Sequence, residues 1–78
     1  MPTLLIYGPY RFYFFSHENN EPPHVHVDRD SFSAKFWLDP VSLSKNIGFS
    51  ASELNKIIAI IVKNQNKFLE NWYDYFNL

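Results

Sequence analysis

A chain of 78 residues forms one small domain, residues 1–78, and eight Phe, five Tyr and two Trp residues can supply the core that so short a chain needs. The absence of cysteine excludes disulfides and thiolate zinc sites and is compatible with a reducing cytoplasm. The net charge of −1 argues against a strong non-specific nucleic-acid binder but is consistent with a local site. No stretch reaches the roughly 20 apolar residues of a membrane span, so we expect no membrane partner.

Short apolar runs separated by turn residues predict an antiparallel sheet within residues 1–47. Strands are expected where aromatic and β-branched residues gather, at 3–7, 10–15, 24–28 and 33–38. A fifth, edge strand would fit residues 41–47, because Val41 and Leu43 alternate there with serines. The sequence therefore predicts four or five strands.

A long amphipathic pattern within residues 50–76 predicts one C-terminal helix packed on one face of the sheet. Ser50 and Glu53 have capping-box spacing, with Ser50 as the cap and Glu53 reaching back to it. A helix from Ala51 to about Tyr75 would be roughly 37 Å long, whereas a six-residue strand covers about 20 Å. The expected fold class is therefore α+β, with one long helix that extends beyond its sheet.

Four aromatic residues recur at helical spacing in the part of the helix that this sheet would not reach: Phe68, Trp72, Tyr75 and Phe76. They either fold back on their own domain or form an interface with another chain. Large exposed aromatic patches are rare on monomers, which favours the interface. A symmetric homodimer is the first expectation, and a partner protein is the second.

All three histidines lie within residues 17–26. His24 and His26 are two residues apart, so in a strand both imidazoles lie on one face and Val25 and Val27 lie on the other. Imidazole changes charge near physiological pH and is also the commonest metal ligand. The pair can therefore be an acid/base pair, half of a metal site or a polar surface patch.

The strands on either side give these histidines expected neighbours. Pairing about an Asp30-Ser31 turn places His24 opposite Trp37 and His26 opposite Lys35.

The preceding strand is expected to add Arg11 and Tyr13 to this face, because an arginine is costly to bury under the helix. Such a face would suit a phosphodiester. One imidazole would act as base and the other as acid. Lys35 and Arg11 would neutralise the developing charge, and Tyr13 or Trp37 would stack on a base. This chemistry requires no metal or other cofactor.

A metal site would need a third ligand, which His17, Glu18, Glu21 or Asp28 could provide. Asp28 lies on the same strand face as the two histidines, so the metal-binding alternative is His24, His26 and Asp28. We rank it below a metal-free site. The carboxylates of Glu18 and Glu21 are expected to be solvated only.

The chain resembles the family called domain of unknown function 4160, which comprises small bacterial proteins. The resemblance rests on blocks that occur in one order: Met1-Pro2-Thr3, Tyr10-Arg11-Phe12-Tyr13-Phe14, Glu21-Pro22-Pro23-His24-Val25-His26-Val27, Ala34-Lys35-Phe36-Trp37-Leu38-Asp39-Pro40 and Gly48-Phe49-Ser50. It implies a bacterial or phage-borne origin. It also implies a neighbouring gene for a small protein of the domain-of-unknown-function 2442 type, in an arrangement like toxin and antitoxin. It implies no catalytic residue.

Three functional hypotheses follow. The first is a cytoplasmic toxin-like protein, a metal-independent ribonuclease that acts through His24 and His26; the clustered cationic and aromatic face favours it. The second is a non-catalytic module that docks the antitoxin-like partner, and the near-neutral charge favours it. The third is a histidine-based metal-binding protein.

Overall fold

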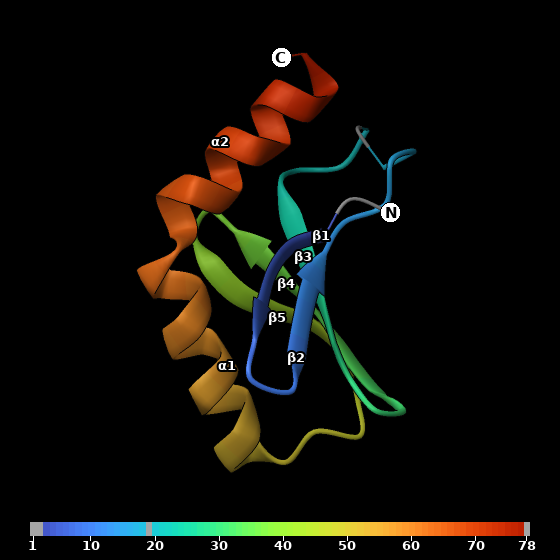
Figure 1. The fold of residues 1–78 in the computed structure, drawn as a ribbon, viewed down its shortest axis with the longest axis vertical. Helices are drawn as coiled ribbons and strands as arrows, with labels where there is room; N and C mark the ends of the chain where they lie inside the picture. The colour runs from blue at the N-terminus through green and yellow to red at the C-terminus, as the bar shows by residue number, and fades with distance from the viewer. Residues whose placement is uncertain (1–2, 19, 78) are drawn as a thin grey trace.

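A five-stranded antiparallel sheet is followed by two helices in the computed structural model, which describes residues 3–18 and 20–77 (Figure 1). The elements are β1 (Thr3–Tyr7), β2 (Tyr10–Tyr13), β3 (His24–Arg29), β4 (Phe32–Leu38), β5 (Val41–Ile47), α1 (Ala51–Lys63) and α2 (Gln65–Phe76). Each strand pairs with its neighbour in sequence, in the order β1-β2-β3-β4-β5. The predicted α+β class is confirmed, with the fifth strand present.

The predicted pairing of β3 with β4 is also confirmed. His24 pairs with Trp37, and His26 pairs with Lys35. Asp30 lies in the turn at a φ of 55°, in the left-handed region that aspartate tolerates better than most residues.

The core lies between one sheet face and the two helices. The alternation of β3 places Val25 and Val27 on that face, and both are 0% exposed. Phe12 of β2 packs on Phe68 of α2, with ring centroids 5.8 Å apart. The two imidazoles of β3 are therefore directed to the opposite face.

The helical region is broken at Asn64, so the prediction of one long helix over 50–76 is wrong. The side-chain amide of Asn64 donates to the carbonyl of Ile60 at 2.8 Å, and its backbone N–H contacts the same carbonyl and that of Ile61. Asparagine favours such local hydrogen bonds over continuing a helix. The Gln65 amide then donates to the carbonyl of Leu38 at 2.7 Å, which fixes the start of α2 against the end of β4. Neither helix of the described residues is long and apolar enough to cross a membrane.

Because the chain changes direction near Asn64 (Figure 1), part of the aromatic end folds back on its own domain. Phe68 is 0% exposed and Trp72 is 1% exposed. The Trp72 ring lies 5.2 Å from Phe14 and 4.8 Å from His24. Assigning Phe68 and Trp72 to an interface is therefore wrong, because the broken helix keeps them over the sheet and the end of β2.

The last two interface candidates differ from these. Phe76 is half-buried and packs on Trp72, whereas Tyr75 is 52% exposed. A homodimer through this end stays a prediction, which light scattering on the purified protein would test.

Ser50 caps α1 as predicted, since its hydroxyl accepts the Glu53 N–H at 3.2 Å. The Glu53 carboxylate is directed elsewhere, contrary to the capping-box prediction. It accepts from the guanidinium of Arg29, with Nη2 at 2.8 Å, and from the hydroxyl of Tyr10 at 2.8 Å. The hydrogen bond from Arg29 is the main reason that the pKa of Glu53 is lowered.

This ion pair predicts an acid-dependent stability difference. A carboxylate whose pKa is lower in the folded state stabilises the protein above its unfolded pKa, and this contribution is lost as the pH falls through the folded pKa. We expect Glu53→Gln to be less stable than the wild type at about pH 7, and this difference in stability to shrink as the pH falls through the lowered folded-state pKa of Glu53. Urea unfolding at neutral and at acidic pH measures this, with the exposed Glu70→Gln as control. A difference in unfolding free energy between Glu53→Gln and the wild type that is unchanged at low pH would contradict the prediction.

Candidate functional site

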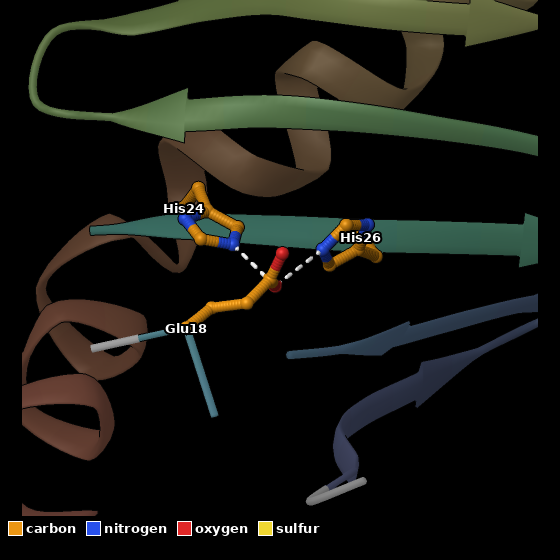
Figure 2. A group of neighbouring side chains, drawn as sticks. All are labelled: Glu18, His24 and His26. Atoms are coloured by element: carbon orange, nitrogen blue, oxygen red, sulfur yellow. Dashed lines mark hydrogen bonds and ion pairs between the residues drawn. The ribbon is translucent and has the colours of Figure 1, made fainter. Parts of the chain in front are cut away.

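The two imidazoles of β3 lie on one face of the strand, with the carboxylate of Glu18 between them (Figure 2). His26 lies away from the helices, whereas His24 also contacts Trp72 of α2. Tyr13 of β2 pairs with His26, and their rings stack with centroids 5.4 Å apart. The structure thus brings Tyr13 to the histidine face, as the burial argument predicted. Arg11 is on the same strand face, where its guanidinium covers the Tyr13 ring at 4.6 Å.

Glu18 joins the two histidines. Its Oε1 lies 2.8 Å from His24 Nε2 and 3.0 Å from His26 Nε2. Its side chain is only 17% exposed, so the expectation that this carboxylate is merely solvated is wrong. Glu18 belongs to a polar loop whose turns bring it back to the sheet. The backbone N–H of Glu18 donates to the carbonyl of Phe15, and the carbonyl of Glu18 accepts from the backbone N–H of Glu21.

His24 is a fixed, fully buried imidazole. Its Nδ1 donates to the Pro22 carbonyl at 3.0 Å, because that oxygen can only accept. Its side chain is 0% exposed, and the rings of Trp37 and Trp72 lie 5.8 Å and 4.8 Å away. A polynucleotide on this face would therefore contact His26, whose side chain is 16% exposed, and not His24.

Lys35 and Glu21 form a second pair on the face. Lys35 Nζ donates to Glu21 Oε1 at 2.6 Å and lies 4.6 Å from the Trp37 ring centre. The Glu21 side chain is 35% exposed. Like Glu18, it is engaged with the sheet, contrary to the prediction that it is only solvated.

Asp28 is committed to Tyr13. Both of its oxygens accept from the Tyr13 hydroxyl, at 3.1 and 3.0 Å. Burial, reinforced by this bond, raises the pKa of Tyr13 to about 12, so the phenol stays protonated at neutral pH. The structure places Glu18, and not Asp28, beside the two histidines.

The charge states of the cluster follow from its surroundings. Burial opposes ionisation of Glu18, but the hydrogen bonds from both histidines outweigh it, and the pKa of Glu18 is lowered. Burial also lowers the pKa of His26, against the opposing effect of the Glu18 bond. Near neutral pH, Glu18 is therefore ionised and His26 is neutral.

Four side chains form a row across the sheet, with one from each of β2, β3, β4 and β5: Tyr13, His26, Lys35 and Lys45. They line a pocket of about 220 Å³, to which Phe15 also contributes. Like charges directly opposite each other destabilise a sheet, and Lys35 pairs directly with Lys45. Lys35 is also held by Glu21 at 2.6 Å, so the charge of this row that an anionic ligand would meet first is that of Lys45.

Glu18, His24 and His26 could also hold a metal ion. Each offers one ligand atom, and the three atoms lie within 4.8 Å of one another. A larger pocket of about 400 Å³ lies elsewhere, between β1 and α2, and the histidines do not line it.

Residues 10–73 match the model of the family described as Domain of unknown function (DUF4160). No curated protein and no solved structure matches the chain. The matched segment contains the whole cross-strand row and the Glu18, His24 and His26 cluster.

Proposed function

We propose that this chain, which belongs to the DUF4160 family, is the toxin-like component of a bacterial two-protein module and binds and cleaves RNA in the cytoplasm. The observation that carries the proposal is the row of Tyr13, His26, Lys35 and Lys45 around one pocket. The face opposite the helices would be the RNA-binding surface.

Charge and shape support a phosphodiester as the ligand. Lys45 pairs directly with Lys35, whose charge Glu21 already offsets, so an anion would be bound mainly by Lys45 and would compete with Glu21 for Lys35. Tyr13 and Phe15 line the same pocket, and aromatic rings beside a phosphate site suit the bases of single-stranded RNA. A small negative net charge of the whole chain does not oppose so local a site.

His26 is the group best placed to take part in the chemistry. It lines the pocket, and its lowered pKa keeps it neutral near neutral pH, which is the form that accepts a proton from an attacking hydroxyl. As that oxygen bonds to phosphorus, the bond from phosphorus to the leaving oxygen breaks, and the leaving oxygen takes a proton from water. Glu18 orients the ring of His26. The two lysines would stabilise the negative charge that develops on the phosphoryl oxygens.

RNA binding by the lysines predicts a specific salt dependence. Removing one phosphate contact with single-stranded nucleic acid reduces the slope of log K against log salt concentration by about 0.7. We expect Lys45→Ala to show this reduction and weaker binding to all sequences. Fluorescence anisotropy with labelled single-stranded RNA measures it. Lys67→Ala, an exposed lysine of α2, is the matched control. Equal slopes for Lys45→Ala and the wild type would contradict the site.

A second candidate function, docking of a partner protein, has its own observation. β5 is an edge strand, and Leu43 within it is 43% exposed. Such an edge can pair with a strand of another chain. The partner would be the antitoxin-like protein of the domain-of-unknown-function 2442 type.

Co-expression distinguishes these roles. A toxin arrests growth alone and is neutralised by the neighbouring gene product; an absence of arrest would reject the toxin role. Capture of that product by the wild type but not by Leu43→Asp would support docking at β5. Val62→Asp, an exposed position of α1, serves as control.

A further inference from the structure

The spacing of Glu18, His24 and His26 fits the ligand set of a metal ion. The Glu18 Oε1 atom lies 2.8 Å from one Nε2 and 3.0 Å from the other. Around a zinc-sized ion with tetrahedral bonds of about 2.0–2.1 Å, neighbouring ligand atoms lie about 3.3 Å apart. The carboxylate oxygen would therefore move slightly away from each imidazole, and the two Nε2 atoms, which lie within 4.8 Å of each other, would move closer together to surround an ion.

The orientation of His24 provides a second, independent observation. Its Nδ1–H donates to the carbonyl of Pro22, and its Nε2 lies 2.8 Å from the Glu18 carboxylate oxygen, which can only accept. Either a proton on Nε2 or a metal ion must therefore lie between these two atoms. A metal-ligating histidine usually donates its other ring N–H to a backbone carbonyl or carboxylate, and the contact of His24 Nδ1 with the Pro22 carbonyl has this arrangement.

We propose that Glu18, His24 and His26 bind one divalent first-row transition-metal ion. Two imidazoles and one carboxylate are ligands that suit Zn²⁺ and, in a more open geometry, Mn²⁺, Fe²⁺ or Co²⁺. Three protein ligands leave coordination positions for other molecules, as in catalytic sites. This differs from the metal-free acid/base pair that the sequence favoured.

The ion would lie beside the RNA pocket, because His26 belongs both to the cluster and to the pocket lining. A phosphoryl oxygen bound by Lys35 and Lys45 could then also contact the ion. The neighbouring charge of Lys35 is offset by Glu21 at 2.6 Å, which limits its repulsion of a cation. The proposal that an ion binds rests on the geometry of the cluster alone. The proposal that this ion contacts RNA rests also on the proposed function.

Calorimetric titration of the chelator-treated full chain with ZnCl₂ or CoCl₂ tests the proposal. We expect one ion per chain. Glu18→Gln keeps the size of the side chain. Glu18→Gln and His26→Ala, as two separate variants, should each weaken ion binding by more than the ~10–100-fold typical of losing an outer-shell partner. His17→Ala removes the third histidine, which lies outside the cluster, and should bind as the wild type does. Circular dichroism verifies that each variant is folded.

Absence of saturable binding to the wild type would overturn the proposal, as would unchanged affinity in folded Glu18→Gln. A proton alone would then hold the cluster together. These outcomes are separable from the RNA proposal: a normal salt slope with no ion binding rejects only the metal centre, and ion binding with no RNA binding rejects only the RNA site.

Discussion

Replacing Trp72 with alanine is expected to lower the free energy of unfolding by about 3–5 kcal/mol, the usual cost of truncating a fully buried large aromatic side chain. Trp72 is 1% exposed and packs on Phe14, Phe76 and His24. Trp72 therefore packs both at the end of the core and against the histidine cluster. Tyr73→Ala, one residue away but 42% exposed, should change stability far less.

Urea denaturation of the two variants at several protein concentrations measures this. A decrease in the unfolding free energy of Trp72→Ala that does not depend on protein concentration would agree with burial of Trp72 within one chain. Near-wild-type stability, or a loss that appears only at concentrations where a dimer forms, would instead indicate that the aromatic end is covered by another chain.

Replacing His26 with alanine is expected to reduce the rate of RNA cleavage by about 10²–10⁴-fold, the range for losing a positioned acid/base group. The side chain is 16% exposed and on the face away from the core, so the variant should stay folded. Single-turnover cleavage of a labelled RNA by the chelator-treated protein measures the rate. His17→Ala is the control.

A wild-type cleavage rate in folded His26→Ala would show that this face does not perform the chemistry. His24→Ala is a less informative variant than the sequence suggested. His24 is 0% exposed and hydrogen-bonded at both ring nitrogens, so its loss should also destabilise the fold.

Local periodicity was sufficient to predict the sheet. The alternation of histidines and valines in β3, with a turn at Asp30, determines both the faces and the pairing with β4, and the structure has this register. The helix break was not predictable from periodicity, because apolar spacing continues from α1 into α2. The available signal was Asn64, a weak helix former whose amide bonds the carbonyl of Ile60.

The site was predictable only where strands alone position its residues. Tyr13, His26 and Lys35 came together as alternation required. Glu18 lies in an irregular loop whose path depends on contacts with the folded sheet. Lys45 was missed because the register of β4 with β5 shifts next to Lys35, and no sequence pattern indicates such an irregularity.

The claim that the sheet face opposite the helices binds RNA is tested most directly by a nuclear magnetic resonance titration of the ¹⁵N-labelled protein. A short single-stranded RNA is added in the presence of Zn²⁺, and the amide shifts are followed. We expect the largest changes at Tyr13, His26, Lys35 and Lys45, and smaller changes in Lys45→Ala. Changes confined to the exposed β5 edge or to α2, or no changes at all, would contradict it.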